Sequence, residues 1–138
     1  SNEPVAEHAT AMAVACGHGF TAVVVENGDL WTCGRNDEGQ LGLDTGLDRY
    51  KDAMAWRNRS HGKPQTILSL VGGADKVFEG EAVVMVAAGK AHTACVTTRG
   101  TLWGWGQNDD GQLGHGDNDP RQRPERMIGG SPAVMVAC

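Results

Sequence analysis

The sequence predicts an all-β protein made of antiparallel four-stranded blades of a β-propeller, incomplete in this chain at about two blades. A repeat carries the prediction: residues 14–44 (VACGHGFTAVVVENGDLWTCGRNDEGQLGLD) recur as residues 86–116 (VAAGKAHTACVTTRGTLWGWGQNDDGQLGHG), and a third copy begins at Val136. Each copy contains short apolar runs separated by turn sequences, and a proline-led segment lies beyond each copy. A repeat of about 50 residues with four strands is typical of a propeller blade.

Each copy begins with three strands that we expect to pair as a meander. Apolar residues, many of them β-branched or aromatic, dominate these runs, as in most strands. Asn27-Gly28 suits a two-residue hairpin in which both residues take positive φ, and Arg99-Gly100 marks the matching turn. The expected strands are residues from about 12 to 16, 20–25 and 30–33 in the first copy, and 84–88, 92–97 and 102–105 in the second.

A polar turn follows each meander and ends in the same Gln-Leu-Gly sequence. The single leucine in it, Leu41 or Leu113, is expected to hold the loop against the sheet. Further along, Pro64 and Pro124 each lead a short segment that contains apolar residues. Because proline is tolerated at the start of a strand and on an edge strand, these segments are predicted to form the outer strand of each blade.

The repeat divides the chain into two blades with flanking pieces. The first repeat is longer because of two inserts, which fall near 45–63 and 69–82 when Pro64 is aligned with Pro124. Two full repeats are too few for a closed propeller, so the chain is expected to be a fragment of one. The predicted divisions are a lead-in at 1–11, a first blade at 12–83, a second blade at 84–133 and the start of a third repeat at 134–138.

Composition and charge narrow the function classes. Hydrophobic residues make up 40% and charged residues 21% of the 138 residues, which is typical of a globular protein. The net charge of −5 argues against direct nucleic-acid binding by this piece. No apolar run approaches the roughly 20 residues that cross a bilayer, so no membrane partner is expected.

The four cysteines are expected to be buried, reduced thiols. Cysteine positions in one repeat hold alanine, tryptophan or valine in another, as Cys33 and Trp105 illustrate, so they are packing positions. The sequence has no Cys-x-x-Cys spacing of the kind that binds zinc. Reduced thiols favour an intracellular location, in the nucleus or the cytoplasm.

The insert at 45–63 is the candidate binding segment. It is locally basic and aromatic in an acidic chain, and inserts in repeat proteins lie in loops that often bind partners. A solvated loop without a partner is the alternative. The candidate partner-binding residues are Arg49, Tyr50, Lys51, Trp56, Arg57, Arg59 and Lys63.

No catalytic, cofactor or metal site is predicted. His92-Thr93 has no serine or cysteine nucleophile and no carboxylate at matching repeat positions, so we expect a structural histidine. Neither a helix pattern nor a Lys-Ser/Thr pair follows Gly104-Trp105-Gly106, as a phosphate-binding loop would require. The acidic turns lack the spacing of a calcium-binding loop.

The repeated motif resembles a known family. Residues 86–116, with their Ala-Gly, His-Thr, Trp-Gly and Gly-Gln-Leu-Gly elements, are similar to the regulator of chromosome condensation repeat, and the similarity covers 12–44 and 84–138. In that family about seven repeats close into a β-propeller. Its founding member is the guanine-nucleotide exchange factor of the small GTPase Ran and docks on nucleosomes. Other members are adaptor domains in ubiquitin ligases, kinases and ciliary proteins.

One plant relative in this family senses UV-B light through tryptophans in a Gly-Trp-Arg-His-Thr motif. The matching stretches here, 17–21 and 89–93, contain no tryptophan, so a light sensor is not expected. Trp31, Trp103 and Trp105 lie on predicted strands and are expected to belong to the core.

The resemblance implies a protein-interaction module, a fragment of an intracellular β-propeller that presents loops to a protein partner. The alternative is a guanine-nucleotide exchange factor for a small GTPase, Ran-like and associated with chromatin. A third hypothesis is a purely structural repeat array. The expected partner is a small GTPase or a chromatin protein. Because each blade buries one face against the next, self-association or the remainder of the propeller is expected to complete the ring.

Overall fold

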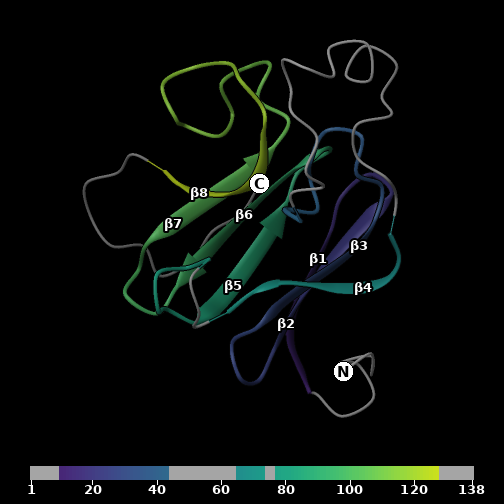
Figure 1. Cartoon of the computed structure of the whole chain (residues 1–138), viewed down its shortest axis with the longest axis vertical. Helices are drawn as coiled ribbons and strands as arrows, with labels where there is room; N and C mark the ends of the chain where they lie inside the picture. Colours follow the sequence, from purple (N-terminus) through teal and green to yellow (C-terminus); the bar gives the residue numbers. More distant parts are fainter. Residues whose placement is uncertain (1–9, 44–64, 74–76, 128–138) are drawn as a thin grey trace.

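The computed structural model describes residues 10–43, 65–73 and 77–127, which form two four-stranded antiparallel sheets (Figure 1). We call the sheet in the order β1-β2-β3-β4 blade 1 and the sheet in the order β5-β6-β7-β8 blade 2. The described residues contain no helix, which confirms the all-β prediction. The strands are β1 Ala11–Cys16, β2 Phe20–Val25, β3 Leu30–Gly34, β4 Gln65–Gly72, β5 Val83–Ala88, β6 His92–Thr97, β7 Leu102–Gly106 and β8 Arg121–Arg126.

None of the described residues belongs to a helix that is long and apolar enough to cross a membrane.

The meander strands lie where the sequence predicts them. The second strand of each blade, β2 or β6, has the predicted bounds. The first and third strands differ from the prediction by about one residue at one end. The outer strand β8 begins at Arg121, three residues before Pro124, because the polar residues of 121–123 also pair with β7. Pro124 lies inside an edge strand whose register is irregular, so its missing N–H costs the sheet little.

The predicted two-residue hairpin at Asn27-Gly28 is wrong, because the loop has three residues. Gly28 N donates to Val25 O at 2.9 Å and Val25 N donates to Asp29 O at 3.0 Å, which is a turn closed by a glycine bulge. Gly28 has the predicted positive φ, +89°, but Asn27 does not. The Asn27 side chain instead accepts a hydrogen bond from Asp29 N at 2.9 Å, which holds the turn from inside. Gly100, at φ +80°, closes the matching loop.

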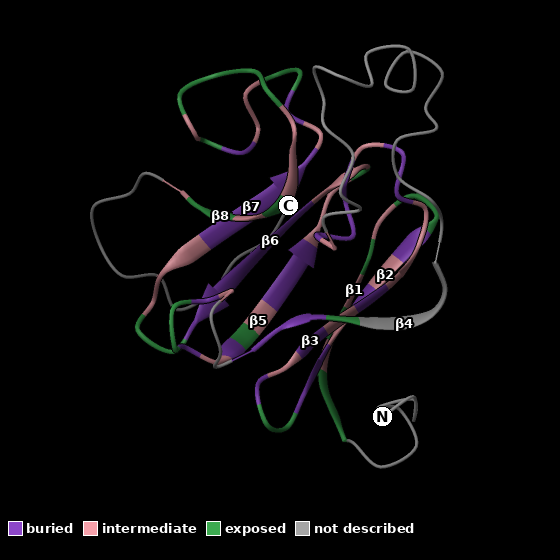
Figure 2. Cartoon of the chain, viewed as in Figure 1, coloured by how far each residue is buried: buried purple, intermediate pink, exposed green. Residues whose placement is uncertain are grey.

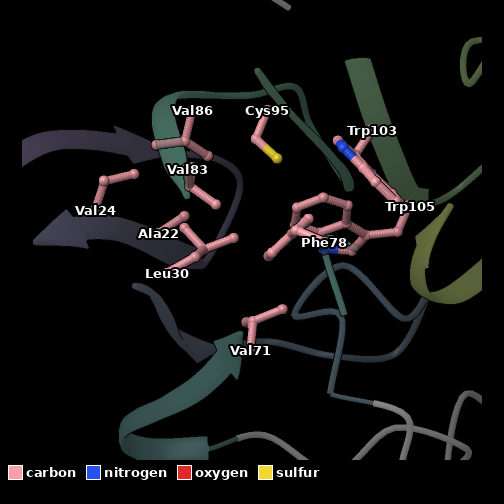
Figure 3. Packing of buried hydrophobic residues seen from close by; sticks show 10 residues of the cluster. All are labelled: Ala22, Val24, Leu30, Val71, Phe78, Val83, Val86, Cys95, Trp103 and Trp105. Carbon is pink, nitrogen blue, oxygen red and sulfur yellow. The ribbon is translucent and has the colours of Figure 1, made fainter. Parts of the chain in front are cut away.

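The hydrophobic core lies between the two blades. Side chains from β2 and β3, such as Ala22 and Leu30, face Val83 and Val86 of β5 (Figure 3). Figure 2 shows the consequence for burial: β6 is buried at every residue but its first and β5 is buried at half of its residues, whereas β1 consists of exposed and half-buried residues. One face of blade 2 is therefore covered by blade 1.

Phe78 completes this core from the connection between β4 and β5. Its side chain is fully buried and packs edge-on against Trp103, with 5.3 Å between the ring centroids, and also touches Trp105 (Figure 3). Such aromatic pairs stabilise a core beyond the area they bury. The segment 69–82, predicted as an insert, thus contributes both the end of β4 and a central core residue.

The three described cysteines are free thiols in three different environments. Cys95 is fully buried, and burial raises the pKa of its thiol, so it stays protonated. Cys33 is half-buried and Cys16 is exposed, so the prediction of burial is confirmed for Cys95 and wrong for Cys16. Cys16 is exposed because it lies on the face of β1 that points away from blade 2. Cys138 lies outside the described residues.

Candidate interaction surface

Because neighbouring strands are antiparallel, the longer loops of both sheets lie at the same end. We call this the loop end; it holds the turns 17–19 and 89–91 and the loops 35–43 and 107–120 (Figure 1). The opposite end, the hairpin end, holds the tight turns after β2 and β6. Gln65 pairs with Gly34, so β4 starts at the loop end, beside the place where β3 finishes.

The insert predicted to bind a partner therefore lies between two described segments that both reach the loop end. Its candidate residues lie outside the described residues, so their positions stay a prediction. They are Arg49, Tyr50, Lys51, Trp56, Arg57, Arg59 and Lys63.

The loop 35–43 is held rigid by its own polar side chains. Asn36 Oδ1 accepts a hydrogen bond from Leu41 N at 3.1 Å, and Gln40 Oε1 accepts one from Glu38 N at 2.8 Å. The side chain of Leu41 is fully buried, and Thr32 Oγ1 donates to its carbonyl at 2.8 Å. The prediction that this leucine holds the loop against the sheet is confirmed.

The matching part of blade 2 repeats this geometry. Asn108 Oδ1 accepts from Leu113 N at 3.0 Å, Gln112 Oε1 accepts from Asp110 N at 2.9 Å, and Leu113 is fully buried. The same residue types at the same spacing thus build the same loop twice. Each loop presents its remaining polar groups on a fixed backbone, as a binding surface requires.

Blade 2 extends its loop with an acidic segment that is braced by Arg121. Asn108 Nδ2 donates to the carbonyls of Asp117 and Asp119 at 2.9 Å each, and Arg121 forms an ion pair with Asp117 at 2.8 Å. The hydrogen bond from Arg121 lowers the pKa of Asp117 to about 2, so this carboxylate is charged near neutral pH. Asp109, on the same loop, is exposed.

The two short turns at the loop end carry basic side chains. His18 and Lys90 occupy the same repeat position and are both exposed, and His18 N donates to Lys90 O at 3.0 Å. Arg35 N donates to Gly19 O at 2.8 Å, and the Arg35 side chain pairs with Asp37. The two short turns therefore carry His18 and Lys90, whereas the loops 35–43 and 107–120 carry carboxylates, one of which is paired with Arg35.

His92 begins β6 and serves the packing of this end. It is half-buried, and burial lowers the pKa of its imidazole, so the ring is neutral near pH 7. Its ring lies against Gly89, where any side chain would collide with it. Among the described residues, no group of three or more His, Cys, Asp or Glu side chains is arranged to hold a metal ion.

A shared carbonyl ties the two blades together at the loop end. Gln40 O accepts hydrogen bonds from Thr93 Oγ1 at 2.8 Å and from Trp105 Nε1 at 3.0 Å. All three residues are fully buried. The Gln-Leu-Gly loop of blade 1 thus seats on blade 2, a contact that no pattern in the sequence indicates directly.

Family models of the regulator of chromosome condensation (RCC1) repeat match most of the chain. One model matches residues 27–96 and 99–138, and a second model of the same repeat matches 13–40 and 83–112. The chain belongs to the RCC1 repeat family. The family resemblance seen in the sequence is confirmed.

Two curated relatives and two solved structures illustrate the similarity. Ultraviolet-B receptor UVR8 of Arabidopsis thaliana is 41% identical over 91% of this chain and 24% of its own length. Human probable E3 ubiquitin-protein ligase HERC3 is 30% identical over 94% of this chain and 11% of its own length. The chain therefore spans a quarter or less of the length of these RCC1 repeat proteins.

The solved structures show the fold. Human WBSCR16 superimposes with a TM-score of 0.71 at 24% identity, covering 93% of this chain and 28% of its own. Prp20p of Saccharomyces cerevisiae superimposes with a TM-score of 0.70 at 22% identity, covering 89% of this chain and 26% of its own. These structural neighbours are RCC1 β-propellers. The two sheets of this chain are therefore propeller blades, as predicted.

Proposed function

We propose that this RCC1 repeat segment acts as a protein-interaction module that binds its partner through the loop end. The observation that carries the proposal is a contrast between scaffold and loops. The two blades repeat the same strands and the same braced Gln-Leu-Gly loop, whereas the segments inserted beside those loops differ in length and charge. Variable loops on a fixed scaffold are the usual way in which repeat proteins bind partners.

The distribution of charged residues also favours the loop end as the surface that binds a partner. The insert of blade 1 is basic in sequence, and the described side chains at the loop end include His18, Lys90 and Arg35, the last of which is paired with Asp37. The loop of blade 2 is acidic. A partner that covers both would be oriented by opposite charges, which speeds association and fixes register.

The proposed partner is a small GTPase or a chromatin protein. The alternative activity is guanine-nucleotide exchange on a small GTPase. Prp20p, whose fold this chain shares, has binding properties to Gsp1p and histones, which motivates both candidate partners here. An exchange factor needs no nucleophile of its own. The described thiols are free, in keeping with our proposal of an intracellular site of action in the nucleus or the cytoplasm.

The binding test uses the 138-residue chain immobilised on a biosensor, with histone octamers and a panel of small GTPases as probes. We expect at least one probe to bind. We expect its affinity to fall about tenfold or more when Arg49, Lys51, Arg57, Arg59 and Lys63 are all changed to Ser, because charged contacts at a protein interface are lost. Thermal stability should change by less than about 0.5 kcal/mol, since surface substitutions rarely do more.

The control removes basic groups far from the loop end. Arg99→Ser with Arg126→Ser lies on the hairpin end and the outer strand, where both positions are exposed, and should leave binding unchanged. Release of a fluorescent GDP analogue from the same GTPases then separates the two activities. Binding without faster release supports an interaction module, and faster release supports the exchange factor. No binding to any probe, or equal loss in both variants, overturns the proposal.

A further inference from the structure

The outer edge of blade 1 differs in chemistry from the outer edge of blade 2. β4 and β8 are the last strands of their sheets, so each has one edge with which no strand among the described residues pairs. β8 (RQRPER) has four charged residues and Pro124, and both features discourage the pairing of a further strand. β4 (QTILSLVG) contains neither a charged residue nor a proline. Of the two edges, that of β4 is therefore the one suited to an added strand.

The position of this edge does not depend on how many blades the chain contains. Neighbouring blades pack through the faces of their sheets, as side chains of β2 and β3 do against β5. Further blades of a propeller cover sheet faces in the same way and leave the outermost strand of each blade on the perimeter. The outer edge of β4 therefore belongs to the outside of the ring.

A groove with a volume of about 340 Å³ lies between β4 of blade 1 and β8 of blade 2, both of which are present in this chain. Its lining is mainly apolar and includes Leu43, Leu70, Val71, Val77 and Pro124. Val71 is 8% exposed and points toward the core, whereas Leu70 is 46% exposed (Figure 3). The groove thus leads from the surface to the edge of the core and is large enough to receive apolar side chains.

The charged residue of this lining is Arg123, whose side chain is exposed. A guanidinium has five N–H donors, so Arg123 can bind a carboxylate in addition to its contacts within the chain. Arg121, on the same strand, forms ion pairs with both Asp117 and Glu125. The groove therefore favours a segment that carries an acidic residue. The β4 strand of a second copy offers none, because its sequence is uncharged.

We propose that β4 and the groove bind an extended segment of a partner protein, which adds to blade 1 as a fifth strand. The backbone of the segment pairs with the outer edge of β4, and its alternate apolar side chains enter the groove. An acidic side chain of the segment pairs with Arg123. This surface is the outer edge of blade 1, whereas the proposed partner binding uses the loop end, so either proposal can fail without the other.

The probe is a fluorescein-labelled octapeptide in which valine and threonine alternate and one central threonine is replaced by aspartate. Fluorescence anisotropy with the 138-residue chain measures its affinity, and we expect saturable binding. Two further versions carry N-methyl groups on alternate amides, one version for each edge of the peptide strand. Methylation of the edge that faces β4 should abolish binding, and methylation of the other edge should preserve it, because an added strand pairs through one edge.

Arg123→Glu tests the ion pair with the bound segment. It should weaken binding of the aspartate peptide about tenfold or more and should strengthen binding of a peptide with lysine in place of aspartate. Arg126→Glu is the control, because it makes the same change of charge on the same strand outside the groove, and it should leave both affinities unchanged. Leu70→Glu should fold, since Leu70 is half-exposed, and should weaken the aspartate peptide by placing a second carboxylate in the groove.

Absence of binding by the aspartate peptide overturns the proposal. So does an equal loss of affinity when either edge of the peptide is methylated, or an Arg123→Glu variant that keeps the wild-type preference for aspartate over lysine. Sedimentation velocity of the chain with and without peptide identifies a competing occupant. A dimer of the chain that excludes the peptide would show that β4 pairs with a second copy, which also overturns the proposal.

Discussion

The indole N–H of Trp105 in blade 2 donates a hydrogen bond to the backbone carbonyl of Gln40 in blade 1, with 3.0 Å between donor and acceptor. The two residues are 65 positions apart in the chain. Gln40 belongs to the loop that closes its own blade, yet its carbonyl is used by the next one. The Gln-Leu-Gly sequence of this repeat thus links neighbouring blades as well as ending a loop.

Removing this link should weaken the junction of the blades. Trp105→Phe deletes the donor and part of a fully buried side chain, so we expect the free energy of unfolding to fall by about 2–4 kcal/mol. Thr93→Val, which removes the other donor to Gln40 O while keeping the shape, should cost about 1–2 kcal/mol. Urea unfolding followed by circular dichroism, at one protein concentration for all variants, measures both. Equal midpoints for Trp105→Phe and the wild type would rule out a role for this contact.

The two blades differ in the hydrogen bonding of the tryptophan indole N–H on their third strand. Trp103 Nε1 donates to Thr97 Oγ1 at 3.2 Å, and Thr97 Oγ1 in turn donates to Glu81 at 2.8 Å. Val25 stands at the repeat position of Thr97, and the buried Nε1 of Trp31 has no hydrogen-bond partner within the described part of the chain. An unpaired buried donor costs free energy.

The same repeat position can therefore be tested by two opposite substitutions, one in each blade. Thr97→Val should destabilise the chain by about 1–3 kcal/mol, because it leaves Trp103 Nε1 unpaired and takes a donor from Glu81. Val25→Thr should be neutral or stabilising by up to about 1 kcal/mol, because the new hydroxyl lies where Trp31 lacks an acceptor. Thermal and urea unfolding of the two variants decide the point. The explanation fails if both exchanges cost the same.

The strands could be predicted because each sits in a clear local pattern. Phe20–Val25 and His92–Thr97 are runs of β-branched and small apolar residues that end at glycine turns, and a strand is the only element they suit. The start of β8 could not be predicted in the same way. Residues 121–123 are polar and pair with β7 only because the blade provides an edge for them.

The parts that escaped prediction depend on contacts between repeats. Phe78 lies alone in a glycine-rich stretch, so no periodicity marks it as a core residue; it is buried because two tryptophans of the next blade surround it. The hydrogen bonds of Gln40 likewise require the packing of two blades. Of the candidate site, the loop end and its scaffold are described, whereas the basic insert itself rests on its sequence.

The hairpin glycines provide a third test. Gly100 has a φ of +80°, so Gly100→Val should cost about 1 kcal/mol or more through backbone strain. Gly28→Val should cost more, because a Cβ at Gly28 would also lie 2.4 Å from Cβ of Ala82 at the blade junction. Thr98→Val, an exposed neighbour in the second hairpin, is the control and should change stability by less than about 0.5 kcal/mol. Thermal unfolding of the three variants should give this order; a Gly100→Val variant as stable as the control contradicts it.

Glu81 connects the segment before β5 to the second hairpin. Its carboxylate accepts hydrogen bonds from Thr97 Oγ1 at 2.8 Å, from Arg99 N at 2.8 Å and from Thr101 Oγ1 at 3.2 Å. Burial by itself raises the pKa of Glu81. The hydrogen bonds and the charge of Arg99 together outweigh burial, and the pKa of Glu81 is lowered below its ordinary value. The ionised carboxylate is therefore the form that the folded chain stabilises.

The last prediction is a loss of stability in acid that depends on Glu81. A carboxylate whose folded pKa lies below its unfolded pKa, about 4.3 for glutamate, stabilises the fold fully above that value, and the contribution disappears as pH falls through the folded pKa. We expect the free energy of unfolding to decline below about pH 5, measured by urea unfolding from pH 7 to pH 3. Glu81→Gln should be less stable than wild type at pH 7 by about 1 kcal/mol. The reason is that one of the two accepting carboxylate oxygens is replaced by an amide NH₂ group, which cannot accept the hydrogen bonds that the carboxylate receives. It should also lose less stability on acidification. Asp109→Asn removes an exposed carboxylate and should keep the wild-type slope, so an unchanged slope in Glu81→Gln would show that Glu81 is not the group responsible.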